Sequence, residues 1–175
     1  IVIPAQKILF FPSYDFIPTY KSAFSAYQNR QKEILDDKQT FNASKSDDIP
    51  YELTKRYGSE LRILVSALLG ERMARRDEYC SSRQNGDVVD TNKFRSRLDD
   101  VIDIWNSLIE HRELYCDNSG NLQIKYSQSD KTEEYPAFRM SDGEREIFYV
   151  VGRVLLAKPS SLIVIDEPEL HLHKA

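Results

Sequence analysis

Four consecutive apolar residues followed at once by two carboxylates and a proline most strongly constrain how this chain can fold. Residues Leu162–Ile165 are rich in β-branched types, and Asp166, Glu167 and Pro168 follow them. A short, continuous apolar run is typical of a strand buried on both faces, as in the parallel sheet of an α/β domain. Because Pro168 cannot donate a ladder hydrogen bond, we predict that the strand ends near Asp166 and Glu167. Both acids would then lie at the carboxyl end of a central strand, where α/β sheets bind ligands.

A second feature is a predicted helix that begins at Ser141. Its apolar residues fall at helical spacing, and they are Ile147, Val150, Val151, Val154 and Leu155. Ser141 suits the N-cap position, and Glu144 stands where the acid of a capping box would be. Gly143 lets backbone come close to a ligand, and the free N–H groups of a helix start form a natural anion site. The alternative is an ordinary capped helix followed by a strand, but the two features together are uncommon at this spacing.

The combination resembles the signature and Walker B motifs of ABC-type ATPases. The signature segment is Met140-Ser141-Asp142-Gly143-Glu144, and the Walker B segment runs from Leu162 to His173. The tail Glu-Leu-His-Leu-His after the acid pair is typical of the soluble branch with RecF-like, SMC-like and OLD-family members, rather than of membrane transporters. The resemblance covers residues 140–175 and implies an α/β P-loop NTPase fold, an ABC-type head with an inserted helical lobe.

The acid pair has a chemical interpretation of its own. One acid can hold Mg²⁺ directly or through water, and its neighbour can polarise an attacking water; an Asp-Glu-Pro surface turn is the alternative. The resemblance assigns Mg²⁺ to Asp166 and the role of catalytic base to Glu167. It places His171 and His173 in the D-loop region, which crosses the interface between two heads. A zinc site at these histidines is not predicted, because no third ligand with suitable spacing stands nearby.

The resemblance also assigns roles in ATP binding to the signature segment. Ser141 and Gly143 would contact the γ-phosphate of an ATP held by a second head, and Glu144 belongs to the same motif. Asp142 departs from the family pattern, in which glycine is usual at this position. A carboxylate near a phosphate is unfavourable unless it points away or is paired.

No Gly-x-x-x-x-Gly-Lys-Ser/Thr sequence occurs in the 175 residues, so no loop here can cradle a triphosphate in the usual way. We expect that loop to precede Ile1 in the same protein or to come from another polypeptide. The chain is therefore predicted to be part of one ABC-type ATPase domain and inactive as a fragment. A degenerate pseudo-ATPase is the alternative.

Composition limits the class of protein. Hydrophobic residues make up 41% and charged residues 30%, values that suit a soluble globular domain with a core. No apolar run is long enough to cross a membrane, and Cys80 and Cys116 indicate no disulfide framework, so a reducing cytoplasm is expected. The net charge of −4 gives no global attraction to nucleic acid, and any contact would need a local patch.

The rest of the sequence divides into predicted segments. Residues 1–18 contain an apolar run, Lys7–Phe11, that predicts a core strand, and residues 19–111 form a helical lobe. Its apolar stripes are Tyr20, Phe24, Tyr27 and Ile34; then Leu61, Leu64, Val65, Leu68 and Leu69, after a cap at Ser59; then Phe94, Leu98, Val101, Trp105 and Leu108. Breaks are predicted at Lys38–Asp48 and Asp87–Thr91. Residues 112–139 predict a hairpin of Glu113–Cys116 with Leu122–Tyr126, and then a mobile loop at Ser127–Glu134.

Six arginines lie near one another in the sequence: Arg72, Arg75, Arg76, Arg83, Arg95 and Arg97. They could form a phosphate-binding patch for nucleic acid or for the acidic face of a partner. Acids are interleaved with them, which favours the alternative of a solvated, salt-bridged helix surface.

Three functions are compatible with these features. The first is an ATPase head that engages a second head, as a homo-oligomer, and gates an effector such as a nuclease in phage defence or DNA maintenance. The second is a nucleotide-sensing scaffold with little hydrolysis. The third is an interaction domain in which the motif pair is coincidental. Substrate, effector and pathway cannot be extracted from these residues.

Overall fold

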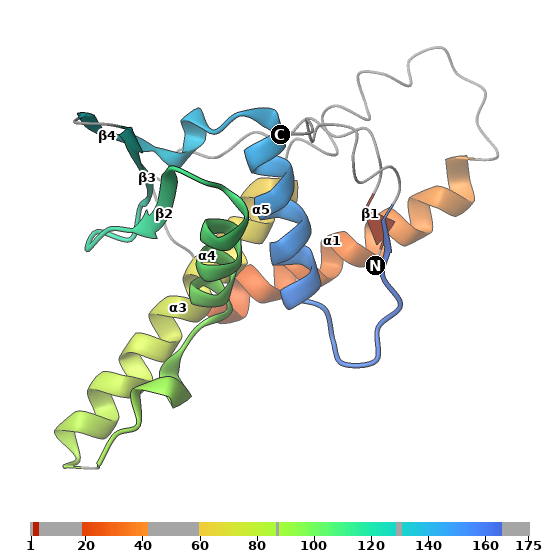
Figure 1. Ribbon diagram of the computed structural model, residues 1–175. Coiled ribbons are helices and arrows are strands. Elements are labelled where there is room, and N and C mark those ends of the chain that lie inside the picture. Colours follow the sequence, from red (N-terminus) through yellow and green to blue (C-terminus); the bar gives the residue numbers. More distant parts are fainter. Residues whose placement is uncertain (1, 4–18, 42–59, 87, 129–130, 166–175) are drawn as a thin grey trace.

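The computed structural model describes residues 2–3, 19–41, 60–86, 88–128 and 131–165 (Figure 1). The helices are α1 (Tyr20–Phe41), α3 (Glu60–Gln84), α4 (Arg97–Leu108) and α5 (Asp142–Leu155), with 3₁₀ turns η1 (Thr91–Phe94) and η2 (Ala137–Arg139). The strands are β1 (Val2–Ile3), β2 (Arg112–Cys116), β3 (Leu122–Gln128), β4 (Lys131–Pro136) and β5 (Val164–Ile165). The core strand predicted at Lys7–Phe11 and the cap predicted at Ser59 lie outside the described residues.

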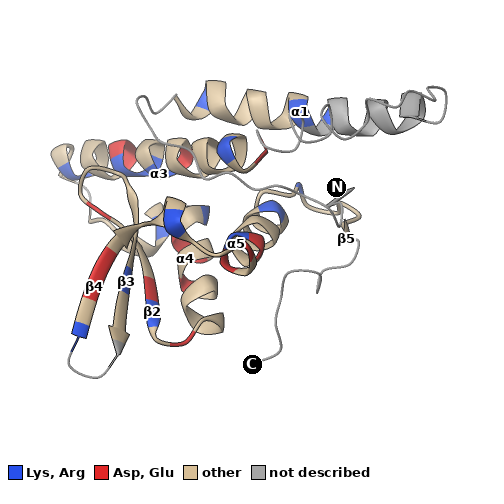
Figure 2. Ribbon diagram, turned by 90° about the horizontal axis from the view of Figure 1, so that it is seen from above, with Lys and Arg blue, Asp and Glu red and all other residues tan. Residues whose placement is uncertain are grey.

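Helix α3 lies at the centre of the hydrophobic core. It contacts α1 on one side and α4 and α5 on the other (Figure 2). Its predicted apolar face is confirmed, because all five of its residues are at most 2% exposed: Leu61, Leu64, Val65, Leu68 and Leu69. The half of α3 that extends beyond this core carries charges of both signs (Figure 2).

Helix α1 covers the outer side of α3 through aromatic residues. Tyr27 is buried and Phe24 packs against the core, and their ring centroids are 6.2 Å apart. The loop predicted to start at Lys38 is wrong at its beginning, because the helix continues to Phe41. Residues 38–41 contain neither glycine nor proline, so nothing local ends the helix there.

Helix α4 begins with a capping box. Ser96 donates its backbone N–H to Asp99 Oδ2 at 2.9 Å, and its hydroxyl accepts from the Asp99 N–H at 3.3 Å. Leu98, Val101 and Trp105 are fully buried, as the predicted stripe requires. The predicted stripe is wrong at both ends, because Phe94 belongs to η1 and Leu108, at the last turn of α4, is 59% exposed.

Strands β2, β3 and β4 form an antiparallel sheet in that order. The predicted hairpin is confirmed, and its turn is closed by Asp117, whose carboxylate accepts the N–H groups of Ser119 and Asn121. Gly120 has φ +88°, a conformation that glycine adopts without strain. The mobile loop predicted at Ser127–Glu134 is wrong over its described residues, because residues 127–128 belong to β3 and residues 131–134 pair with them and with the rest of β3 as part of β4. This edge strand is polar because its side chains are mostly exposed, so no apolar alternation marked it.

Strands β1 and β5 pair in parallel, with Val2 opposite Val164 and Ile3 opposite Ile165. The prediction of a parallel strand is thus confirmed at Val164–Ile165. Burial on both faces is wrong for the described residues, because Leu162 is 78% and Val164 49% exposed while Ile165 packs against the core. One face of this strand is covered and the other is open.

The buried side of α5 differs from its predicted apolar stripe. Val154 is 40% exposed, whereas Phe148, Tyr149 and Arg153 are each at most 1% exposed. Gly152 is buried and lies against Leu64. The predicted stripe residues Ile147, Val150, Val151 and Leu155 are partly buried against the core. Helical periodicity predicts the correct element, but the most deeply buried side includes charged and aromatic residues whose partners lie on α1 and α3.

Gly152 lies where α5 packs against Leu64 of α3. A Cβ atom at this position would lie 3.0 Å from Leu64 Cδ2. We expect Gly152→Val to lower the free energy of unfolding by about 1–3 kcal/mol, because the added atoms overpack a buried contact. Urea unfolding followed by circular dichroism measures the change. Gly86→Ala is not an equivalent control, because Gly86 has φ +81°. Ser25→Val is suitable, because Ser25 is exposed on α1. Equal effects of Gly152→Val and Ser25→Val would contradict the packing argument.

Candidate functional site

The predicted site residues fall into two groups. Ser141, Gly143 and Glu144 lie at the start of α5 and are described. Asp166, Glu167, His171 and His173 lie outside the described residues. The geometry therefore concerns the signature segment, and the roles of the acid pair and the two histidines stay predictions.

The capping box predicted at the start of α5 is confirmed. Ser141 is the N-cap, and its hydroxyl accepts from the Glu144 N–H at 3.4 Å. In return, Glu144 Oε2 accepts from the Ser141 N–H at 2.7 Å and from the Ser141 hydroxyl at 2.8 Å. Ser141 itself is exposed, so its position is fixed while one side of it faces solvent.

The first turn of α5 suits an anion. The N–H groups of Asp142 and Gly143 are the first of the helix and have no acceptor within it. The partial positive charge of a helix start adds to their attraction for an anion. The Asp142 carboxylate, which opposes such an anion, is 80% exposed and forms an ion pair with Arg145 at 3.2 Å. A carboxylate near a phosphate is tolerated if its charge is paired. The ion pair with Arg145 meets this condition for Asp142.

Glu144 is held from two other elements. Its side chain is 7% exposed and forms an ion pair with Arg112 at the start of β2. Its carbonyl oxygen accepts the indole N–H of Trp105, on α4, at 3.2 Å. These contacts give Glu144 a role in fixing the start of α5, and a direct contact of its carboxylate with a phosphate stays a prediction.

Arg112 was not identified from the sequence. Burial by itself lowers its pKa, but the hydrogen bond and the charge of Glu144 raise the pKa above the ordinary arginine value. The guanidinium also lies 5.7 Å from the ring centroid of Tyr126 on β3. No local signal could have revealed it, because Arg112 and Glu144 are brought together only by the packing of the sheet against α4 and α5.

The middle of α5 contains a buried polar cluster. Tyr149 donates its hydroxyl to Glu60, and Arg153 lies 3.9 Å from the same carboxylate. The Arg153 guanidinium also lies 5.5 Å from the ring centroids of both Tyr27 and Tyr149. Burial, with the neighbouring charge of Glu60, raises the pKa of Tyr149 well above its usual value, so the phenol stays protonated as a donor. The cluster ties α5 to α1 and α3.

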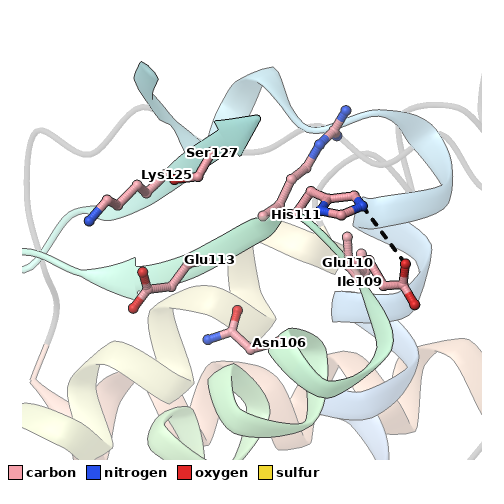
Figure 3. A pocket seen from close by; sticks show the side chains of 8 residues that line it. Asn106, Ile109, Glu110, His111, Glu113, Lys125 and Ser127 are labelled. Atoms are coloured by element: carbon pink, nitrogen blue, oxygen red, sulfur yellow. Dashed lines mark ion pairs between the residues drawn. The ribbon is translucent and has the colours of Figure 1, made fainter. Parts of the chain in front are cut away.

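A shallow pocket of about 480 Å³ lies beside Arg112, between the end of α4 and strands β2 and β3 (Figure 3). It is lined by Asn106, Ile109, Glu110, His111, Arg112, Glu113, Lys125 and Ser127. Its charges are of both signs, and the Asn106 amide is engaged by the backbone of Leu114 at 2.7 and 3.0 Å. The pocket therefore selects no particular class of ligand.

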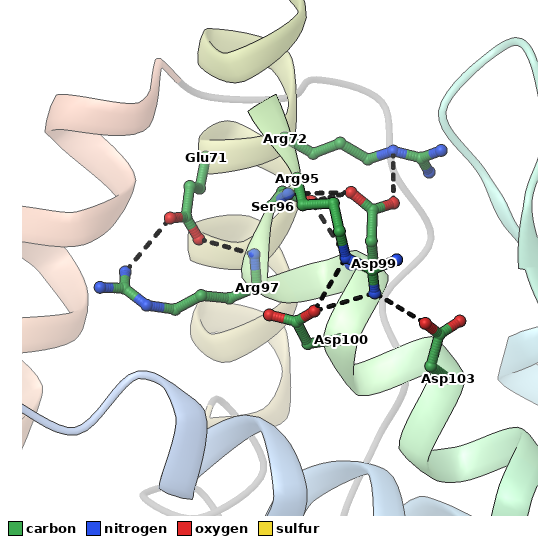
Figure 4. A network of polar contacts seen from close by, with 8 residues as sticks. All are labelled: Glu71, Arg72, Arg95, Ser96, Arg97, Asp99, Asp100 and Asp103. Carbon is green, nitrogen blue, oxygen red and sulfur yellow. Dashed lines mark hydrogen bonds and ion pairs between the residues drawn. The ribbon is translucent and has the colours of Figure 1, made fainter. Parts of the chain in front are cut away.

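Four of the six arginines that lie near one another in the sequence are paired with acids, and Figure 4 shows three of the four, Arg72, Arg95 and Arg97. Ion pairs join Arg72 to Asp99, Arg75 to Glu78, Arg97 to Glu71, and Arg95 to both Asp100 and Asp103. This pattern favours the interpretation as a salt-bridged helix surface. Binding of nucleic acid there stays a prediction.

The described ranges contain neither a metal-binding cluster nor a membrane-spanning helix. Within residues 2–3, 19–41, 60–86, 88–128 and 131–165, no group of three or more His, Cys, Asp or Glu side chains could hold a metal ion. Over the same ranges, no helix has the length and apolar character needed to span a bilayer.

Comparison with known proteins gives one match. Residues 19–174 match the family described as "AAA domain, putative AbiEii toxin, Type IV TA system". No curated protein and no solved structure matches the chain significantly. The matched region contains the capped start of α5, the described helices, the three-stranded sheet and the segment of the acid pair. The chain therefore belongs to this family of AAA domains, nucleotide-binding P-loop ATPases of mixed α/β fold.

Proposed function

We propose that residues 1–175 form part of an ABC-type ATPase head that binds and hydrolyses ATP and engages a second head through the nucleotide. The observation that carries the proposal is the start of α5. There, the exposed N-cap residue Ser141 stands beside the free N–H groups of Asp142 and Gly143, and Arg145 offsets the adverse charge of Asp142.

The topology supports an ABC-type head with an inserted lobe. The parallel pair β1–β5 brings together two segments that are separated by all of the described helices and by the three-stranded sheet. A connection between parallel strands must cross over, and here the crossover contains the helical lobe, residues 19–111, and the sheet within residues 112–139. The signature helix and the Walker B strand then follow within residues 140–175.

The acid pair supplies the hydrolytic chemistry in this proposal. Asp166 would hold Mg²⁺, which would offset the negative charge of the phosphates. Glu167 accepts a proton from the attacking water. His171 and His173 stand where the chain crosses to the second head. Phosphoryl transfer needs positioning and charge stabilisation above all.

The signature segment would act across an interface. Ser141 and Gly143 contact the γ-phosphate of the ATP held by the opposite head, so the nucleotide completes the contact between two copies. ATP binding and association are then thermodynamically coupled, and hydrolysis removes the γ-phosphate that joins the heads. The resulting change in association is the signal that a linked effector would receive.

The effector is the least constrained part of the proposal. The family description names a toxin of a type IV toxin–antitoxin system, which supports a role in defence against phage with an effector such as a nuclease. We place the protein in the cytoplasm, where ATP and Mg²⁺ are abundant.

The association state of the intact protein, with and without Mg-ATP, tests the proposed function. We expect ATP, but not ADP, to drive association in sedimentation or light-scattering measurements. Association together with phosphate release supports an ATPase head, whereas association without release favours the nucleotide-sensing scaffold. No response of any kind to ATP would remove both.

Replacement of the signature serine gives a sharper test. We expect Ser141→Arg to abolish ATP-driven association. The bulky arginine side chain would fill the space that the γ-phosphate of the ATP held by the second head requires. Loss of the cap lowers the free energy of unfolding by only about 1 kcal/mol, so the variant stays folded. Sedimentation with ATP, and circular dichroism for folding, measure the two effects.

Two controls accompany that variant. Ser141→Ala loses the same cap without adding bulk, and Ser25→Arg places the same side chain on an exposed part of α1. Ser25→Arg should associate normally, and Ser141→Ala should associate more weakly than the wild type but better than Ser141→Arg. Normal association of Ser141→Arg would exclude the signature interpretation.

A further inference from the structure

The start of α5 is held in place by a chain of contacts that begins in the three-stranded sheet. Arg112, the first residue of β2, forms an ion pair with Oε1 of Glu144. The other oxygen of that carboxylate accepts the Ser141 N–H at 2.7 Å and the Ser141 hydroxyl at 2.8 Å. One carboxylate thus joins the guanidinium of Arg112 to the side chain of Ser141.

The charges in this chain of contacts matter for an anion at the helix start. The Glu144 side chain is 7% exposed, so water screens its negative charge poorly. Arg112 lies against it and neutralises it, while its own side chain remains 36% exposed at the surface of the sheet. Without the arginine, the buried carboxylate would face the region where the N–H groups of Asp142 and Gly143 attract an anion, and it would repel a phosphate there.

We propose that Arg112 is a positioning residue for Ser141 at the start of α5, where the phosphate is bound, and that it acts through Glu144. The inference rests on the proposed function, and it adds to it a residue outside the signature segment. Arg112 orients the carboxylate that fixes Ser141, and it removes a negative charge from beside the nucleotide. Through Arg112, the first residue of β2, the three-stranded sheet would then influence the ATP-dependent contact.

A purely structural role of Arg112 makes a different prediction. The guanidinium also lies 5.7 Å from the Tyr126 ring centroid, so its loss could simply weaken the sheet. In that case stability and association would fall together, and removing the charge of Glu144 would restore neither. The positioning role predicts instead that the response to ATP depends on the charge balance between Arg112 and Glu144.

The test uses the intact protein at a temperature where every variant is folded. The ATP concentration that gives half-maximal association is measured for the wild type, Arg112→Met, Arg112→Lys and the double variant Arg112→Met/Glu144→Gln. We expect Arg112→Met to raise this concentration by about tenfold or more, as for other buried charge pairs that lose one partner. Arg112→Lys keeps the charge and should lie between the wild type and Arg112→Met.

The double variant decides between the two roles. The neutral amide that replaces the Glu144 carboxylate can still accept from the Ser141 N–H, so we expect recovery to within about threefold of the wild type, which is less than about 1 kcal/mol. A double variant that folds but associates no better than Arg112→Met overturns the proposal. If Arg112→Met does not fold, the double variant is compared with the wild type directly, and a folded double variant that needs about tenfold more ATP or worse overturns the proposal.

Arg95→Met is the matched control. Arg95 also forms two ion pairs with acids, Asp100 and Asp103, but at the amino end of α4 and away from Glu144. Its loss should leave the response to ATP unchanged, and a shift as large as that of Arg112→Met would contradict a specific role for Arg112.

Amide hydrogen exchange separates this inference from the proposed function. We expect the Ser141 amide to exchange faster in Arg112→Met without any nucleotide, because its acceptor is less well fixed. Faster exchange with an unchanged response to ATP overturns the positioning role and leaves the proposed function intact. A wild-type protein that does not associate with ATP refutes the proposed function itself.

Discussion

Replacing Glu167 by glutamine is expected to abolish ATP turnover and to trap the associated state. Glutamine has nearly the same shape as glutamate and can still hold a water by hydrogen bonding, but it cannot accept a proton. Loss of a general base lowers such rates by about 10²–10⁴-fold. ATP binding should persist, so association becomes long-lived. Phosphate release and the dissociation rate after removal of free ATP measure the two effects.

Glu169→Gln is the matched control for that change. It makes the same substitution two residues further along the chain, where no role in hydrolysis is assigned. Its turnover should stay close to that of the wild type. Undiminished hydrolysis in Glu167→Gln would exclude Glu167 as the base, and equal losses in both variants would point to a general effect of charge.

The largest expected effect on stability is that of Trp105→Ala. Trp105 is fully buried between α4 and α5, and its indole N–H donates to the Glu144 carbonyl at 3.2 Å. Truncation should lower the free energy of unfolding by about 3–5 kcal/mol, because it leaves a cavity and removes a buried hydrogen bond. Trp105 is the one tryptophan of the chain, so unfolding in urea is best followed by far-ultraviolet circular dichroism.

Two further substitutions show which part of that effect comes from the hydrogen bond. Trp105→Phe keeps most of the apolar contact but loses the donor, so a loss of about 1–3 kcal/mol is expected. Leu108→Ala, on an exposed position of the same helix, should change stability by no more than about 0.5 kcal/mol. A loss of less than about 1 kcal/mol in Trp105→Ala would contradict its place in the core.

Local features of the fold were predictable because their signals are short-range. The capping box of Ser141 and Glu144 is formed by residues three positions apart, and the hairpin turn at Asp117 is closed by its immediate neighbours. The apolar face of α3 has the regular spacing of a helix against a core. In each case the sequence and the tertiary packing favour the same structure.

Features that depend on a partner element, and that no apolar pattern marks, were missed. Strand β4 has almost no apolar residues, and it is a strand because β3 offers it hydrogen-bonding groups. Arg153 reads as a surface residue of an amphipathic helix, yet it is buried because Glu60 and two aromatic rings surround it. Arg112 is assigned to the candidate site only through its ion pair with Glu144. No local pattern encodes such partners.

The pairing of β1 with β5 has a consequence for the order in which the protein folds. Val2 pairs with a residue as distant as Val164, whereas α4, β2, β3 and α5 pack mainly on nearby segments. The entropy lost on closing a loop grows with its length, and non-local contacts slow folding. During synthesis on a ribosome, the intervening lobe can therefore fold before β5, the partner strand of β1, has been synthesised. Strand β5 also follows α5 in the sequence, so the pairing of β1 with β5 is expected only after the helix that begins beside Ser141 has been synthesised.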